Sequence, residues 1–583
     1  MSMINQEIER LMEIQQAILN FLDKDDRDVN ESNNLIQFLD EKEISENPYF
    51  LKDFIRLISK ISNNHHKTQF FWEKIDCILT HFQKHIKENF SDSTIFKIFK
   101  NNKRILYFLF NNNVLIMNNN LFNLLKNEYK DNQSNLVYFM KEISPFIDKY
   151  SFSCLKDRYP AISDFNSESF DQKRKIGENE DYICHLIRND SIVEFITYIN
   201  QINISLNDQK IKFSIFETNC FLTKFDEFSL IEYAAFFGSI QIFKYLHING
   251  VELSSSLWIF AIHGRNSEII HFLEENHIQP EDTTYKRCME ESIKCHHNEI
   301  INYIKENFYK PENYINVYLK NLHNFNFIYL SENKTNDLDD SQILSHFCRS
   351  GCLSIINHFI DDLKVNFNSQ IIIEKEKIIK YKYEIETTIK KYIASPIHFA
   401  VQKKNIELVT LLLKRNDLDI NLKGRFITSV STEAAEPESE EIDEEETALS
   451  IAIKKSDMKI IELLLKRKDI DINQKLNYIE KRESEEDCCC YVGSEWVKSE
   501  EVIKVQQSVI HIAICNKEYD IIKLLLTNQN IDLQSKYIYE KRYWDDMSDG
   551  DISRNENTPL ELANKYRFSG IIALLKEYNK NTK

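Results

Sequence analysis

Glycine and proline are scarce in this chain, with 9 Gly and 8 Pro among 583 residues. A domain of many strands and tight turns uses more of both, for positive-φ positions and chain reversals. The shortage therefore predicts a mostly helical protein. No two glycines lie within eleven residues of each other. This spacing excludes the GxGxxG, P-loop and GxSxG motifs, whose glycines stand two to five residues apart.

Other markers of catalysis are missing as well, since the zinc-protease pattern HExxH does not occur. The sequence thus lacks the usual signatures of nucleotide hydrolysis, hydride transfer, serine hydrolysis and zinc proteolysis. We expect no enzyme, no catalytic residue and no cofactor. An enzyme would need a site within residues 1–180, where no motif indicates one.

Long apolar runs are absent, and none reaches the roughly 20 residues of a membrane span. Residues 1–10 are polar and acidic, unlike a secretory signal. The 12 cysteines are scattered apart from Cys488–Cys490, and adjacent cysteines suit a disulfide framework poorly. The net charge of -18 disfavours a generic nucleic-acid surface. We expect a cytoplasmic protein with no integral membrane segment and no nucleic-acid partner.

What the sequence does contain begins with helical periodicity. One face of a predicted helix over residues 4–22 carries apolar residues spaced by three and four, namely Ile4, Ile8, Leu11, Ile14, Ile18 and Leu22. Similar segments continue to about residue 175 without a clear repeat. The composition allows a sizeable core, because 42% of the residues are hydrophobic.

A hexamer ending in alanine recurs after residue 182. Its copies are SLIEYA (229–234), SLWIFA (256–261), SPIHFA (395–400), TALSIA (447–452), SVIHIA (508–513) and TPLELA (558–563). Each copy is followed by a second apolar helical segment, so the unit is a helix pair. Weaker copies lie at 288–293 and 343–348. The opening Ser or Thr suits an N-cap, and a Pro after it suits the first helical position.

These residues resemble the ankyrin repeat, whose first helix opens with Thr-Pro-Leu-His-x-Ala. The match is closest in SPIHFA followed by NIELVTLLLKRNDLDIN from Asn405, and in TPLELA. Residues 177–308 look like the degenerate, uncharacterised ankyrin-like domain of large protist ankyrin families. The resemblance implies an all-α, ankyrin-type α-solenoid with β-hairpin finger insertions. We expect an α-helical N-terminal region over 1–175, the degenerate domain over 176–310, and ankyrin repeats with long fingers over 311–583.

The repeats depart from the ankyrin pattern in two ways. The hexamer alanines Ala400, Ala452, Ala513 and Ala563 are 52, 61 and 50 residues apart, whereas an ankyrin repeat has about 33 residues. The extra residues fall where ankyrin units form a hairpin, so we expect three fingers projecting from one edge like a comb. Helix-closing glycines are replaced by Asn or Lys, as at Asn405 and Asn516, which predicts weaker turns.

The candidate metal ligands are better explained as structural residues. His346, Cys348, Cys352 and His358 supply ligand types for zinc, but Cys348 occupies the alanine position of a weak repeat. Cys295, His296 and His297 fit a helix end and turn equally well. We therefore predict no metal site.

The fingers hold several further candidates. Cys488–Cys490 sit among acidic residues that disfavour the thiolate, so they are interpreted as inert thiols, with lipidation as the alternative. The acidic run Glu433–Glu446 is interpreted as a solvated, disordered loop, or else as a lure for a basic partner. Ser484 and Ser548 precede acidic residues and resemble acidophilic kinase sites.

The finger aromatics are the predicted partner-binding residues, namely Tyr478, Tyr491, Trp496, Tyr537, Tyr539, Tyr543 and Trp544. They fit binding hot spots, or equally side chains that hold long hairpins together. The leading hypothesis is a non-catalytic scaffold or adaptor that binds unidentified proteins through the concave ankyrin face and the fingers. The alternative is a regulatory, cytoskeletal or membrane-associated linker that oligomerises through its N-terminal helices. The sequence leaves the oligomeric state open.

Overall fold

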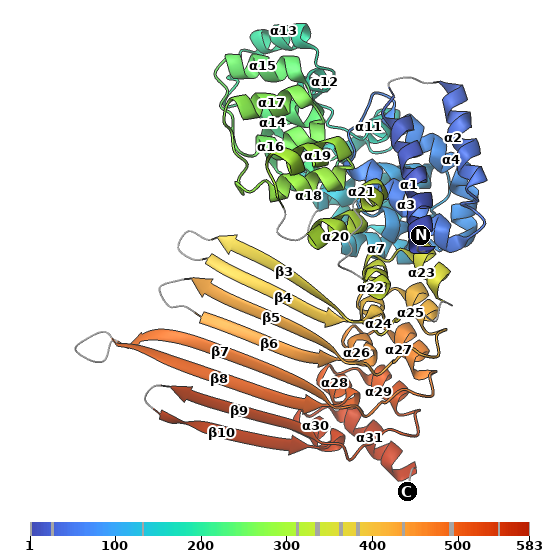
Figure 1. The fold of residues 1–583 in the computed structure, drawn as a ribbon, viewed down its shortest axis with the longest axis vertical. Helices are drawn as coiled ribbons and strands as arrows, with labels where there is room; N and C mark the ends of the chain where they lie inside the picture. The colour runs from blue at the N-terminus through green and yellow to red at the C-terminus, as the bar shows by residue number, and fades with distance from the viewer. Residues whose placement is uncertain are drawn as a thin grey trace. The chain divides into compact units, whose positions relative to one another are not determined.

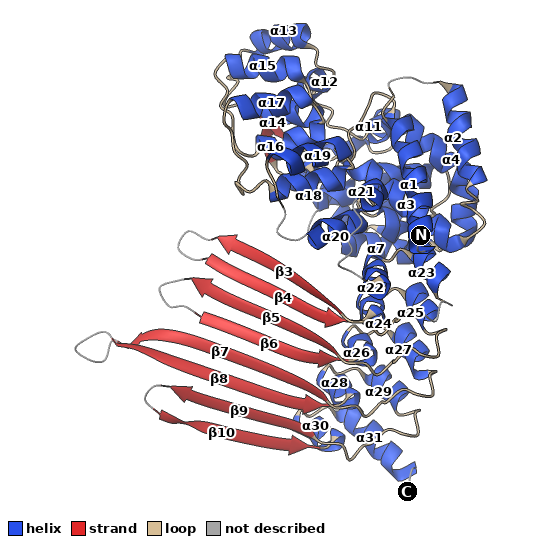
Figure 2. Cartoon of the chain, in the orientation of Figure 1, coloured by secondary structure: helices blue, strands red, loops and turns tan. Residues whose placement is uncertain are grey.

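The computed structural model describes residues 3–24, 28–130, 133–310, 314–332, 339–360, 365–380, 385–433, 438–488, 495–545 and 548–581. The chain divides into two compact units, Met1–Asp337 and Leu338–Lys583, whose elements are labelled in Figure 1. Helices predominate in the first unit, whereas the second combines helices with long strands, as Figure 2 shows.

The N-terminal unit starts with helices that show no repeat. They are α1 (Met3–Leu22), α2 (Val29–Glu41), α3 (Pro48–Asn64), α4 (Phe71–Asn89), α5 (Asp92–Phe99), α6 (Lys103–Asn111), α7 (Asn119–Glu128), α8 (Gln133–Val137), α9 (Met140–Ile143), α10 (Lys149–Arg158) and α11 (Glu168–Ile176). The predicted apolar stripe of α1 is confirmed, because Ile8, Leu11, Ile14, Ile18 and Leu22 are all buried.

Helix pairs make up the rest of this unit, with one short antiparallel ribbon. The helices are α12 (Tyr182–Arg188), α13 (Ile192–Ile202), α14 (Leu230–Phe237), α15 (Ile240–Ile248), α16 (Leu257–Gly264), α17 (Ser267–Glu275), α18 (Lys286–Cys295), α19 (Asn298–Asn307), α20 (Tyr314–Asn324) and α21 (Phe327–Glu332), and the strands are β1 (Lys210–Lys212) and β2 (Glu227–Ser229). One continuous apolar core runs from α12 to α21, as stacked repeats require.

The C-terminal unit stacks five helix pairs. They are α22 (Asp340–Ser350) with α23 (Leu353–Phe359), α24 (Pro396–Gln402) with α25 (Ile406–Leu412), α26 (Ala448–Lys454) with α27 (Met458–Leu465), α28 (Val509–Cys515) with α29 (Tyr519–Leu525), and α30 (Pro559–Lys565) with α31 (Ser569–Asn581). All six predicted hexamers begin a helix at their second residue. Ser395, Thr447, Ser508 and Thr558 each close a capping box with the residue three positions on, which satisfies the first free N–H groups of the helix.

The turn within each pair uses a left-handed residue four positions after the hexamer alanine. Gly238 fills that position once, but Arg265, Lys404, Ser456, Lys517 and Arg567 fill it elsewhere, with φ between 50° and 60°. The prediction that Asn405 and Asn516 replace the glycine is therefore wrong by one residue. Asn405 instead caps α25, since its Oδ1 accepts from Leu408 N at 3.1 Å.

The all-α fold class predicted from the sequence is wrong. Four hairpins emerge between the helix pairs and join into one antiparallel sheet, ordered β10-β9-β8-β7-β6-β5-β4-β3. The strands are β3 (Ile371–Lys380), β4 (Ile385–Ala394), β5 (Gly424–Glu433), β6 (Glu438–Glu446), β7 (Leu476–Cys488), β8 (Glu495–Gln507), β9 (Tyr537–Asp545) and β10 (Ser548–Asn557). The predicted fingers do project from the helix pairs, but they are not separate hairpins, because each one hydrogen-bonds to the next along its length. Figure 1 shows the strands leaving the column of helices on one side.

A row of asparagine side chains links successive repeats by hydrogen bonds. Asn421 donates from Nδ2 to the carbonyl of Asp469 at 2.7 Å and accepts from Asp471 N at 2.7 Å. Asn368 and Asn473 make the same two contacts to their own following repeats. The three asparagines thus link each repeat to the next by side-chain hydrogen bonds.

Candidate partner-binding surface

The hairpin nearest the start of this unit is rich in β-branched residues. Residues 371–380 and 385–394, IIIEKEKIIK and IETTIKKYIA, are dominated by Ile and Thr, which favour strands. This first hairpin, β3–β4, is absent from the sequence-based prediction of three fingers. Its β-branched composition was a signal that could have revealed it.

One row of side chains crosses the whole sheet near the helices. Directly paired residues of antiparallel strands share a face, and the pairing links Ile373, Tyr392, Phe426, Glu444, Tyr478, Val505, Tyr539 and Asn555 in order. The face that carries this row is called the aromatic face below. Tyr392 and Phe426 make an edge contact, with ring centroids 5.5 Å apart.

The base of the aromatic face packs on the first helices of the repeats. Phe399 of α24 lies in one apolar cluster with Ile371, Ile373, Tyr392 and Phe426, and it is only 3% exposed. In α24, α26 and α28 nearly every residue is buried. These first helices therefore offer little free surface to a partner.

The acidic run is a strand where the structure describes it, so the disordered-loop interpretation is wrong. Residues 438–446 form β6, and residues 434–437 lie outside the described part. Neighbouring strands supply cations: Arg425 Nε lies 2.8 Å from Asp443 Oδ1, and Arg482 Nε lies 3.0 Å from Glu440 Oε1. Opposite charges on adjacent strands stabilise a sheet, which explains how so acidic a segment pairs on both sides.

The predicted aromatic residues divide between the two faces. By register, Tyr478, Tyr537, Tyr539 and Tyr543 share the aromatic face, whereas Trp544 pairs with Glu500 on the opposite face. Tyr537 is buried at the base, with its ring 5.9 Å from that of His511. Tyr478 donates its hydroxyl to Glu480 Oε2 at 2.6 Å. These two contacts favour a structural role for Tyr537 and Tyr478.

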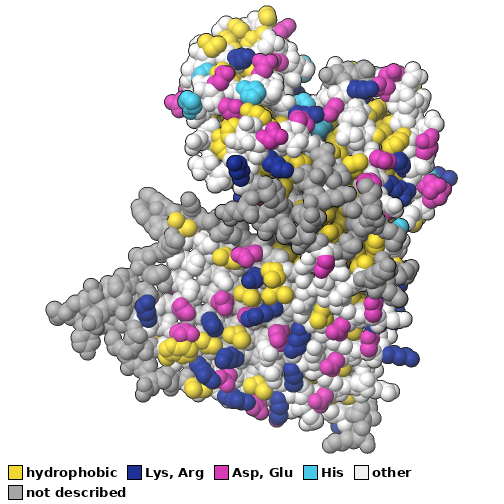
Figure 3. Space-filling model, viewed as in Figure 1, with side chains coloured by type: hydrophobic (Ala, Val, Ile, Leu, Met, Phe, Trp, Pro, Cys, Tyr) yellow, Lys and Arg dark blue, Asp and Glu magenta, His cyan; other side chains and the backbone are white. Residues whose placement is uncertain are grey.

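Two aromatic side chains toward the end of β9 are free to meet a partner. Tyr543 is 40% exposed and Trp544 is 37% exposed. Trp496 lies in β8 opposite Asp487, but its side chain, like all of Tyr491, lies outside the described residues. Figure 3 shows basic, acidic and hydrophobic side chains interspersed over the viewed face of this unit.

One comparison with known families bears on this architecture. Residues 394–425 match the ankyrin-repeat family. This ankyrin repeat comprises α24, α25 and the start of β5. No curated protein and no solved structure matches the chain. An ankyrin repeat is an interaction module without catalytic groups, so the match indicates binding to proteins.

The remaining predicted candidates lie away from the sheet surface or outside the described residues. Cys348 and Cys352 are buried around the turn that precedes α23, and burial raises the pKa of the Cys348 thiol. They do not join His346 and His358 in any metal-competent group found among the described residues. Cys489 and Cys490 lie outside those residues. Ser484 faces Ser499 across β7 and β8, with their hydroxyls 2.8 Å apart.

Within the described parts of the chain, no helix has both the length and the apolar character needed to cross a membrane.

Proposed function

We propose that the chain is a non-catalytic scaffold that binds partner proteins through its eight-stranded sheet. The observation that carries this proposal is the distribution of burial in the C-terminal unit. The first helices are covered by the bases of the hairpins, while Tyr543, Trp544 and Ile552 near the sheet's far edge remain exposed. Exposed aromatics on a scaffold that holds them in register are typical of binding hot spots.

Interspersed charges add specificity to such a surface. On the aromatic face Arg482 and Lys541 alternate with Glu440 and Glu501, so a partner would need a complementary pattern rather than a uniform charge. The described cysteines are free thiols, which supports a reducing, cytoplasmic setting. The likeness of residues 177–308 to a degenerate ankyrin-like domain remains a prediction.

The test needs a purified partner. Proteins captured by the full chain from cell extract would be identified by cross-linking, produced separately, and titrated against defined variants. Tyr543→Ala alters the aromatic face, and Trp544→Ala alters the opposite face one residue away. Tyr519→Ala in α29 is the matched control, because this tyrosine is 45% exposed on a helix.

Truncation of a hot spot costs about 2 kcal/mol, which corresponds to roughly a 30-fold rise in Kd. We expect that loss for one of the two sheet variants and less than about a twofold change for Tyr519→Ala. A partner whose Kd changes with neither sheet variant would place its binding site elsewhere and contradict the proposal.

A further inference from the structure

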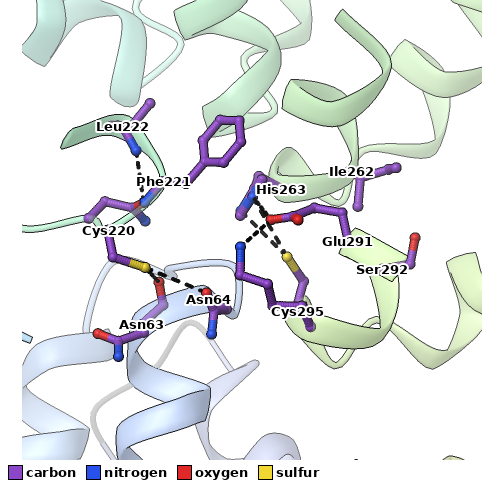
Figure 4. A network of polar contacts seen from close by, with 12 residues as sticks. Asn63, Asn64, Cys220, Phe221, Leu222, Ile262, His263, Glu291, Ser292 and Cys295 are labelled. Carbon is purple, nitrogen blue, oxygen red and sulfur yellow. Dashed lines mark hydrogen bonds and ion pairs between the residues drawn. The ribbon is translucent and has the colours of Figure 1, made fainter. Parts of the chain in front are cut away.

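A compact group of metal-ligating side chains lies between two helices of the N-terminal unit. Glu291 and Cys295 stand four residues apart on α18, so they share one face of that helix, and His263 meets them from α16. Figure 4 shows the three side chains converging. The sequence analysis considered Cys295 as a ligand together with His296 and His297, whereas the structure brings it to Glu291 and to His263, which is distant along the chain.

The ligand atoms of this group lie near enough to one another to share one ion. His263 Nε2 lies 2.8 Å from Glu291 Oε1, and Cys295 Sγ lies 3.4 Å from His263 Nδ1 and 3.9 Å from Nε2. One ligand atom from each residue lies within 4.8 Å of the others. In a tetrahedral zinc site, Zn–S and Zn–N or Zn–O bonds of about 2.3 and 2.0–2.2 Å put the ligand atoms roughly 3.3–3.6 Å apart. Glu291 faces Nε2 of the His263 ring, whereas Cys295 lies nearer Nδ1, so an ion held by all three residues requires the Cys295 side chain to rotate toward Glu291.

The charges of the three side chains would also balance that of a bound zinc ion. Cys295 is fully buried and His263 nearly so. Without metal, the negative charge of Glu291 is balanced by Lys294, whose Nζ lies 2.5 Å from Oε1. A zinc ion bound by one thiolate, one carboxylate and one neutral imidazole forms a site of zero net charge. Such a site can stay buried at low cost.

A thiol–imidazole–carboxylate row also resembles a nucleophilic relay, but its nucleophile must reach a substrate. Cys295 has no exposed surface, and a pocket of this unit that could admit a substrate is lined by other residues, among them Phe110, Lys141 and Arg174. Cys220, the nearest further thiol drawn in Figure 4, points instead to Asn63 O and Asn64 Oδ1 at 3.8 and 3.6 Å. The geometry thus favours a metal over a reacting substrate.

We propose that His263, Glu291 and Cys295 bind one zinc ion, with water in the fourth position. On binding, the Cys295 thiol releases its proton to solvent and forms the Zn–S bond, as coordinated thiols do. Lys294 leaves Glu291 and turns toward solvent, to which 24% of its side chain is already exposed. The bound ion would cross-link α16 to α18. This inference is independent of the proposed function of the sheet.

Cobalt(II) is a suitable probe, because thiolate coordination gives a near-ultraviolet charge-transfer band and tetrahedral geometry gives strong visible bands. The metal-stripped full chain would be titrated with Co²⁺ and then with Zn²⁺, and the bound zinc would be quantified after gel filtration. We expect one Co²⁺ per chain with a thiolate band, displaced by one Zn²⁺. Absence of that band in the wild-type chain would overturn the proposal.

Two substitutions locate the ion. Cys295→Ser should abolish the thiolate band, whereas Cys288→Ser should keep it, because Cys288 is equally buried on the same helix but outside the group. Lys294→Met removes the competing cation and should tighten metal binding by roughly tenfold. The site is assigned wrongly if Cys295→Ser retains the band. If Cys295→Ser fails to fold, the outcome depends on Lys294→Met, and unchanged affinity in that variant counts against the proposal.

Discussion

Acidification should destabilise the C-terminal unit through His398 in α24. Its Nδ1 lies 3.3 Å from Ser395 N and 2.8 Å from Ser395 Oγ, and its Nε2 donates to the carbonyl of Glu446 at 3.2 Å. The neutral ring thus caps its own helix and contacts the next hairpin. Burial lowers the pKa of His398 from 6.5 to about 4, because the cation is poorly solvated there.

The direction and the magnitude of this loss of stability at low pH follow from proton linkage. Below pH 6.5 the unfolded chain binds a proton at His398 that the folded chain does not, so stability present above pH 6.5 is lost as the pH falls toward 4. The full shift corresponds to about 3 kcal/mol, and about 2 kcal/mol of it is lost by pH 5. His511 has its pKa lowered to about 4 by the same cause, burial, and adds a similar loss.

Urea denaturation of the full chain at pH 7.5 and pH 5.0, followed by far-UV circular dichroism, measures this effect. His398→Gln removes the titrating group, so its free energy of unfolding should fall between the two pH values by about 2 kcal/mol less than that of the wild type. His277→Gln, at an exposed position, controls for replacement of a histidine. Equal pH dependence in the wild type and His398→Gln would refute the reasoning.

Two further predictions concern backbone positions. Gly264→Ala would place a Cβ 2.1 Å from a carbonyl oxygen of α14 and should destabilise the N-terminal unit by about 3 kcal/mol. The control is Gly570→Ala, whose Cβ would meet only ring atoms of Tyr519 at 3.9 Å. Equal shifts in the melting temperature of the two variants would contradict the steric argument. Arg567→Gly should raise the free energy of unfolding of the C-terminal unit by about 0.5–1 kcal/mol, because Arg567 holds φ at 59°, where glycine has no Cβ clash. A loss of stability in urea denaturation would show that the left-handed turn is not strained.

The helices could be predicted because their signals are local. The caps, the hexamer alanine and the three–four spacing of apolar residues all lie within a few positions of one another, and they located α24, α26, α28 and α30 correctly. Joining the hairpins into one sheet depends on contacts between residues about 30 to 50 positions apart, such as Thr428 on β5 and Lys390 on β4. No local pattern encodes that pairing, so the all-α prediction failed there.

In the candidate sites, too, the sequence showed the local features but not the contacts between distant segments. The sequence identified Tyr543 and Trp544 as candidate binding residues, but only the register reveals that they lie on opposite faces of the sheet. The acidic residues of β6 looked incompatible with order until Arg425 and Arg482 were placed beside them on neighbouring strands. Likewise, the i, i+4 spacing of Glu291 and Cys295 is visible in the sequence, whereas His263 joins them only when α16 packs on α18.

The continuous sheet has a consequence for how the array can change in length. Two hydrogen-bonded strands are roughly 9–10 Å wide, and packed helices are spaced about 8–10 Å apart. One hairpin per helix pair therefore advances both layers by the same step, and the two stay in phase over β3 to β10. Duplication of a whole repeat would extend helices and sheet together. A repeat that carried no hairpin would instead leave a gap in the hydrogen-bonded ladder, so the repeat and its hairpin are gained or lost as one module.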